Sequence, residues 1–80
     1  MIKIKTYVEI FAKFDTDGNI YPKELIWKNG IRFTIDKIID VSPCASFKCS
    51  GFGTRYTVMI KRKPTYIFLE ENRWFVENKE

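Results

Sequence analysis

The chain has 80 residues, of which 45% are hydrophobic and 16% aromatic, and it contains no histidine. So short a chain can hold only one core, and its aromatic and β-branched content is too high for a disordered segment, so we expect a single β domain spanning residues 1–80. Fourteen Lys and Arg residues against ten Asp and Glu give a net charge of +4. The lack of histidine removes the commonest general base and most zinc sites, so we expect no enzyme, no cofactor and no metal.

The first segment, residues 2–14, alternates between apolar and polar positions, which predicts a β-strand. Its length predicts a bend or bulge partway along. Tyr7 and Phe11 interrupt the polar face and are expected to be exposed. No apolar run approaches the roughly 20 residues that span a bilayer, so we expect a cytoplasmic location and no membrane association.

Two glycine-containing pairs predict hairpin turns, Asp17-Gly18 and Asn29-Gly30. Between them residues 20–28 fit a strand that begins at an edge, because Pro22 cannot donate a ladder hydrogen bond. The carboxylates around the first turn are similar to the start of a calcium loop, but Gly18 stands two positions too early and Ile26 occupies the place of the bidentate glutamate. A simple hairpin turn is therefore the better interpretation.

The third strand is predicted over residues 31–41, with a bulge near Lys37 where the alternation breaks. Ile35, Ile38 and Ile39 also satisfy helical spacing, so a short helix remains an alternative, although their β-branching favours a strand.

A loop is predicted over residues 42–54, which contain Pro43, Gly51 and Gly53 and show no periodicity. Cys44 and Cys49 lie in this polar stretch, and we expect free thiols, because small disulfide-dependent domains usually carry four or more cysteines. Two cysteines would supply only half of a zinc site.

Three further strands follow along residues 55–62, 65–70 and 74–76, with turns at Lys63-Pro64 and Glu71-Asn72. In the first of them Tyr56, Val58 and Ile60 should point inward, whereas residues 65–70 are apolar on both faces, as in a central strand. The carboxylates Glu70, Glu71 and Glu77 are expected to keep an edge strand soluble. Six short strands without helices predict an all-β fold, either a small barrel of the SH3-like or OB-like kind or a strongly curved antiparallel sheet.

All of the excess positive charge lies between residues 41 and 69, which contain five basic residues and no acidic one. The basic residues are Lys48, Arg55, Lys61, Arg62 and Lys63, and the aromatic residues near them in sequence are Phe47, Phe52 and Tyr66. Alternation along the strand places Arg55, Thr57, Met59 and Lys61 on one outward face.

Cations beside rings on a small barrel suit single-stranded nucleic acid, because phosphates contact Lys and Arg while bases stack on aromatic side chains. We therefore expect a monomeric, non-enzymatic binding module with weak nucleic-acid affinity. A charged strand face exposed only to solvent is the plainer alternative. A protein-interaction or assembly domain that uses Tyr7 and Phe11 is a second hypothesis, and an enzyme built on carboxylates is a weak third.

Four segments carry a resemblance to known sequences: Ile26-Trp-Lys-Asn-Gly-Ile-Arg-Phe33, Ile38-Ile-Asp-Val41, Gly53-Thr-Arg-Tyr56 and Arg73-Trp-Phe-Val-Glu77. Together they look like a family of small uncharacterised all-β proteins of Firmicutes bacteria, and more distantly like another bacterial domain of unknown function. Since neither has an assigned activity, the resemblance implies a compact β fold and no catalytic residues.

Overall fold

A computed structural model gives the structure of residues 3–44 and 53–79, with side chains described for residues 4–44 and 53–77. It contains seven strands, which are β1 (Lys3–Phe14), β2 (Ile20–Ile26), β3 (Arg32–Thr34), β4 (Lys37–Pro43), β5 (Thr54–Ile60), β6 (Lys63–Glu70) and β7 (Arg73–Lys79). They form one antiparallel sheet in the order β3-β2-β1-β7-β6-β5-β4. The predicted all-β class and curved sheet are confirmed.

The described ranges contain no helix, and therefore no helix that could cross a membrane. The helical alternative for residues 35–39 is therefore wrong.

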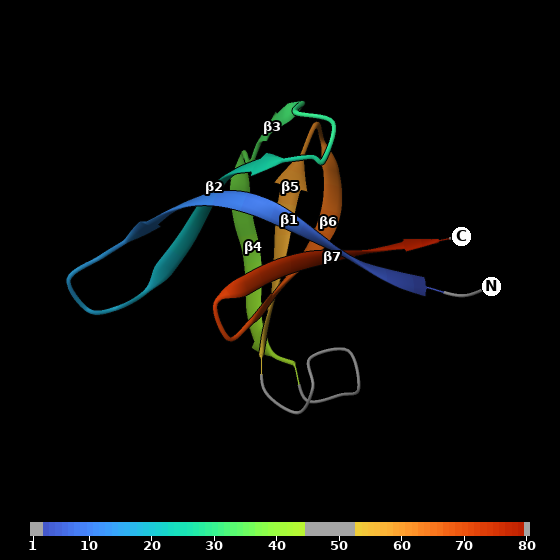
Figure 1. Cartoon of the computed structure of the whole chain (residues 1–80). Helices are drawn as coiled ribbons and strands as arrows, with labels where there is room; N and C mark the ends of the chain where they lie inside the picture. Colours follow the sequence, from blue (N-terminus) through green and yellow to red (C-terminus); the bar gives the residue numbers. More distant parts are fainter. Residues whose placement is uncertain (1–2, 45–52, 80) are drawn as a thin grey trace.

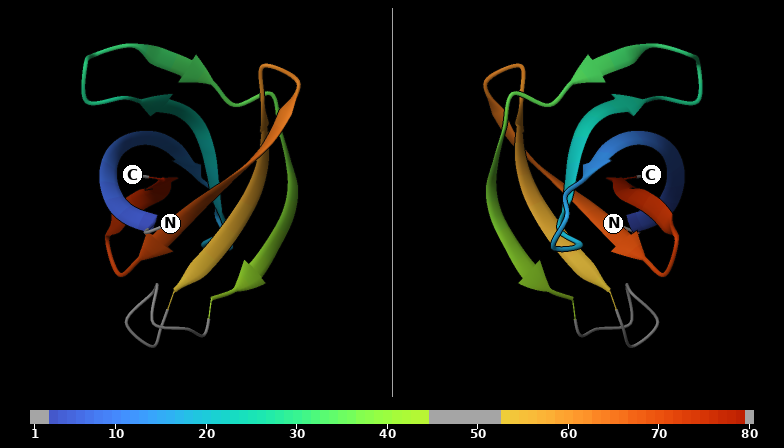
Figure 2. Two further views of the ribbon diagram at one scale, coloured as in Figure 1. Left: turned by 90° about the vertical axis from the view of Figure 1, so that its right-hand side faces the viewer. Right: turned by 90° about the vertical axis from the view of Figure 1, so that its left-hand side faces the viewer.

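The long strand β1 serves two parts of the sheet because it bends along its length, as its length predicts. Its first half, from Lys3 to Val8, pairs with β7, and its second half, from Glu9 to Phe14, pairs with β2. This change of partner helps the sheet to curl into a half-barrel (Figure 2).

The predicted third strand is two strands, which lie at opposite ends of the strand order. β3 pairs with β2 and β4 pairs with β5, and only Ile35 and Asp36 connect them. The amide of Ile35 still donates to the Lys23 carbonyl oxygen beside β3, whereas the next amide, of Asp36, donates to the Met59 carbonyl oxygen in β5. The curl brings the two ends of the sheet so close that two residues suffice to cross between them. The expected bulge is present, but it lies between Ile38 and Asp40 in β4.

Both glycine pairs end strands in hairpins, as predicted. In each turn a glycine takes the left-handed conformation, Gly18 at a φ of 87° and Gly30 at 88°, next to a type I turn closed by backbone hydrogen bonds. The turn expected at Lys63-Pro64 is wrong by two residues, because the chain reverses at Lys61 and Arg62 and β6 begins at Lys63.

The main core lies on the concave face of the sheet. It consists of the buried residues Leu25, Ile35, Tyr56, Val58, Ile67 and Val76. Tyr56 and Val58 point inward as predicted, with Ile60 half-buried beside them. A second cluster formed by Cys44, Phe68 and Phe75 lies on the opposite face, because Ile67 and Phe68 are successive residues of β6. The residues of β6 are therefore buried on both faces, as their composition predicts.

Cys44 is buried and disulfide-bonded, so the prediction of a free thiol is wrong for this residue. Its cluster with Phe68 and Phe75 removes it from the polar surroundings that the sequence suggested. Cys49 and most of the predicted loop lie outside the described residues.

Candidate nucleic-acid interface

The turn between β5 and β6 presents adjacent cations at one end of the half-barrel. Lys61 and Arg62 have φ values of 50° and 65°, the pattern of a type I′ turn. Asn-Gly is the usual pair in such a turn, since a non-glycine residue pays for the left-handed conformation. The side chains of Lys61, Arg62 and Lys63 are all exposed. This turn therefore holds three consecutive cations in solvent at a cost in backbone energy.

A hollow opens beside this turn, where β6 and β7 separate. Among the described residues their pairing covers only Phe68–Glu70 on β6 and Arg73–Phe75 on β7. The hollow has a volume of about 470 Å³. It is lined by Leu25, Trp27, Phe33, Ile60, Pro64, Thr65, Tyr66, Phe68, Val76 and Glu77. Apolar and aromatic side chains thus dominate a site whose rim is basic.

Lys61 and Lys28 lie over aromatic rings that line this hollow. The Lys61 Nζ lies 5.1 Å from the centroid of the Phe33 ring, and the Lys28 Nζ lies 5.7 Å from that of the Trp27 ring. β3 and the β5–β6 turn lie at the same end of the molecule, which explains how residues distant in sequence meet there (Figures 1 and 2). Lys28, Trp27 and Phe33 were missed by the sequence reasoning, because only the crossover from β3 to β4 brings them to the basic turn.

Arg55 is separated from the basic turn. It lies near the start of β5, opposite Ser42 and Phe68, and six strand residues place it about 20 Å from Lys61. Its guanidinium lies 5.1 Å from the centroid of the Tyr66 ring, and its Nε is buried without a hydrogen-bond partner among the described residues. Lys61 lies over Phe33 and so does not continue the outward face of Arg55.

Tyr66 is the predicted aromatic residue that joins these two regions. Its side chain is 56% exposed, contacts the Arg55 guanidinium and lines the hollow. Of the predicted aromatic residues, Tyr66 therefore lines the hollow that opens beside the basic turn. Lys48, Phe47 and Phe52 lie outside the described residues.

The exposed aromatics Tyr7 and Phe11 lie on β1, away from the β5–β6 turn. They are 41% and 47% exposed, as expected. Each ring is contacted by an arginine, with the Arg73 guanidinium 4.3 Å from the Tyr7 centroid and the Arg32 guanidinium 5.4 Å from that of Phe11. Aromatic and cationic groups therefore form a second surface on β1.

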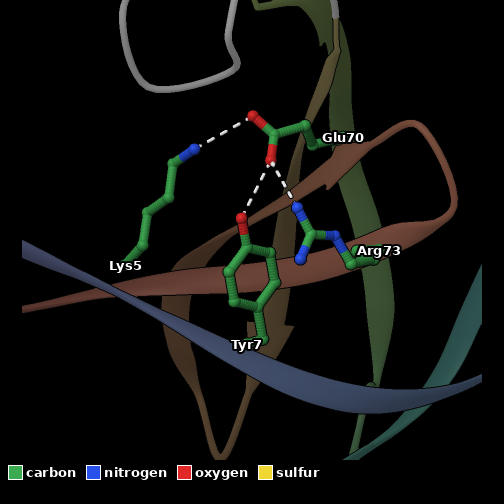
Figure 3. A network of polar contacts seen from close by, with 4 residues as sticks. All are labelled: Lys5, Tyr7, Glu70 and Arg73. Atoms are coloured by element: carbon green, nitrogen blue, oxygen red, sulfur yellow. Dashed lines mark hydrogen bonds and ion pairs between the residues drawn. The ribbon is translucent and has the colours of Figure 1, made fainter.

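The carboxylate of Glu70 is buried, which the sequence did not predict, and Figure 3 shows it among Lys5, Tyr7 and Arg73. Glu70 accepts hydrogen bonds from the Lys5 Nζ at 2.9 Å and from the Tyr7 hydroxyl at 3.0 Å, and the Arg73 guanidinium lies 3.9 Å away. It belongs to β6, which has a neighbour on each side, so its expected role in protecting an edge strand is wrong. Since its oxygens are engaged by groups of β1 and β7, the arrangement connects three strands.

No protein-family model, curated protein or solved structure matches the chain. The resemblance to a Firmicutes family therefore stays a prediction, and the geometry of the site alone carries the functional argument.

Proposed function

We propose that the chain is a non-enzymatic module that binds single-stranded nucleic acid weakly at the hollow beside the β5–β6 turn. Lys61, Arg62 and Lys63 contact phosphates, while bases stack on the exposed Tyr66 ring and at the aromatic rim of the hollow. Arg55, beyond Tyr66, extends the track along the β5–β6 hairpin.

The observation that carries this proposal is the pair of basic residues in the left-handed turn. Backbone strain persists where a site requires it, and Asn-Gly would form the same turn at lower cost. The three exposed cations lie beside a hollow that offers rings but little charge of opposite sign, since Glu77 is the single carboxylate among the described residues that line it. This combination suits a ligand that is both anionic and aromatic.

The test is titration of labelled single-stranded oligonucleotides at low salt. We expect affinities of roughly micromolar or weaker, falling with salt at a log–log slope of about −0.7 per phosphate neutralised. Arg62→Glu and Lys63→Glu should each weaken binding and flatten this slope, and Tyr66→Ala should cost about 1–3 kcal/mol of binding energy. Lys23→Glu, an exposed change of the same charge on β2, is the matched control and should have a smaller effect. Absent binding, or binding equally sensitive to all four changes, would contradict the proposal.

Protein interaction through Tyr7 and Phe11 is the second candidate function, because both rings remain exposed beside another hollow. Burial of aromatic surface depends weakly on salt, which distinguishes it from phosphate binding.

A cytoplasmic location also stays a prediction. The disulfide at Cys44 counts against it, because disulfides are rare in that compartment.

A further inference from the structure

The second half of β1 has one free edge. β7 pairs with β1 from Lys3 to Val8, and β2 pairs with the opposite side of β1 from Glu9 to Phe14. On the β7 side, residues 9–14 therefore have no neighbouring strand in the described part of the chain. The hairpin that carries this edge projects away from the rest of the sheet (Figure 1).

The backbone groups that point toward this edge follow from the alternation of an antiparallel ladder. Ala12 lies opposite Pro22, which has no amide hydrogen, so this pair cannot be a doubly hydrogen-bonded one. The N–H and C=O groups of Ala12, and by alternation those of Ile10 and Phe14, must then point away from β2. Three residues thus present donors and acceptors on the free side.

The two outermost strands of the sheet, β3 and β4, are blunted, unlike this stretch of β1. β4 carries Pro43 and a bulge between Ile38 and Asp40, and β3 is only three residues long. The free edge of β1 instead carries apolar residues, including Phe14, whose side chain is 68% exposed. An edge of this kind is suited to adding a strand.

A hollow of about 550 Å³ runs along this edge. Its lining residues are Tyr7, Val8, Glu9, Ile10, Phe11, Ala12, Phe14, Asn72, Arg73 and Trp74. At its base lies Arg73, whose side chain is exposed. The hollow lies where the pairing of β1 with β7 ends, beside the first residues of β7.

We propose that the occupant is a second copy of the chain, paired antiparallel along residues 10–14 about a two-fold axis at Ala12. This register places Ile10 of one copy opposite Phe14 of the other, so that apolar side chains meet on one face. On the other face, Glu9 lies diagonal to Lys13 of the second copy. Arg73 faces the end of the second copy that carries Asp15. Edge and hydrophobic pattern are therefore self-complementary. The register also places Glu9 directly opposite Asp15 of the second copy, and the cations Lys13 and Arg73 lie beside this pair of carboxylates.

The interface is small, so we expect a weak dimer with a dissociation constant of roughly micromolar to millimolar. Sedimentation equilibrium of the full chain across that range measures it. Ala12→Pro should weaken association more than tenfold, because it removes only an amide that points outward. Val41→Pro is the matched control, since Val41 lies at an outward position of β4, two residues before Pro43, and it should associate like the parent.

A charge exchange tests the proposed register independently. Lys13→Glu alone should weaken the dimer about threefold to tenfold, because it adds a carboxylate beside Glu9 and Asp15 in both symmetric contacts. The double exchange adds Glu9→Lys, which returns an attractive charge to each contact. The double exchange should restore parent affinity. Within one chain these residues are four strand positions apart, about 13 Å, so a contact inside the monomer cannot explain rescue.

Three results would overturn the inference. They are a parent that stays monomeric at millimolar concentration, a dimer indifferent to Ala12→Pro, and a double exchange without rescue. In the first case an extended segment of a different protein would be the better occupant. None of these results bears on oligonucleotide binding, which is proposed for the β5–β6 hairpin and not for the β1–β2 hairpin.

Discussion

Asp15 organises the turn between β1 and β2 through its side chain. Its Oδ1 accepts hydrogen bonds from the amides of Asp17 and Asn19, and its Oδ2 accepts from the Asn19 side chain and the Tyr21 hydroxyl. These donors, led by the Asn19 side chain, lower the pKa of Asp15 from its ordinary 3.8. The hydrogen bond that the Tyr21 hydroxyl donates to Asp15 raises the pKa of Tyr21. The Asp15 carboxylate, which begins the segment that is similar to a calcium loop, therefore stabilises the hairpin turn through hydrogen bonds.

Acid should remove the contribution of Asp15 to stability. Because its pKa is lower in the folded chain than in the unfolded one, the contribution is complete above about pH 3.9 and is lost as the pH falls through the lowered folded value. Asp15→Asn should therefore be less stable than the parent at pH 6, and the difference should shrink near pH 2. Urea unfolding at both pH values measures it. A gap that does not change with pH would contradict this account.

The left-handed turn at Lys61 and Arg62 predicts opposite effects on stability and binding. Replacing the pair by Asn-Gly should raise the free energy of unfolding by about 1–2 kcal/mol, since both positions would then tolerate a positive φ. It should weaken oligonucleotide binding, because two phosphate contacts are lost. Lys63→Gln is the control, which should weaken binding without stabilising the fold. Denaturation and titration of the same samples check both signs.

At the scale of whole strands, alternation predicted the existence of most elements, and the errors occurred where tertiary contacts decide. Residues 31–41 read as one strand because their polarity nearly alternates, yet the amides of Ile35 and Asp36 bond to opposite ends of the sheet. The turn at Lys61 lacks glycine and was missed, so Pro64 attracted the prediction although it lies within β6. The local polarity pattern indicates neither the hydrogen-bond partners of Ile35 and Asp36 nor a tight turn without glycine.

Glu70 joins β6 to β1 and β7, and its loss should destabilise the sheet. We expect Glu70→Ala to lower the free energy of unfolding by about 1–3 kcal/mol, less than a fully buried ion pair would cost, because the side chains of Lys5 and Arg73 are partly exposed. Glu71→Ala removes an exposed carboxylate one residue away and should change stability by less than about 0.5 kcal/mol. If the two variants melted alike, the role of Glu70 between the strands would be wrong.

At the scale of the molecule, the curl of the sheet determines the candidate site. The sequence predicted the curved sheet, and it identified Lys61, Arg62, Lys63 and Tyr66, because these residues are close in the chain. It could not place Trp27 and Phe33 beside them, since that contact exists only after the sheet ends approach each other. The finer likeness to an SH3-like or OB-like barrel stays a prediction.

The crossover at Ile35 should be the position where the curl is most sensitive to truncation. Ile35 is 7% exposed, packs in the main core and continues the pairing of β3 with β2. Ile35→Ala should cost about 2–5 kcal/mol, through lost burial and the cavity left behind, against a total stability near the lower end of about 5–15 kcal/mol for so small a domain. Ile39→Ala makes the same chemical change four residues later at a side chain that is 47% exposed, and it should cost less than about 1 kcal/mol. Chemical denaturation of the two variants beside the parent measures the difference. Equal losses would mean that the crossover is not packed as the structure shows.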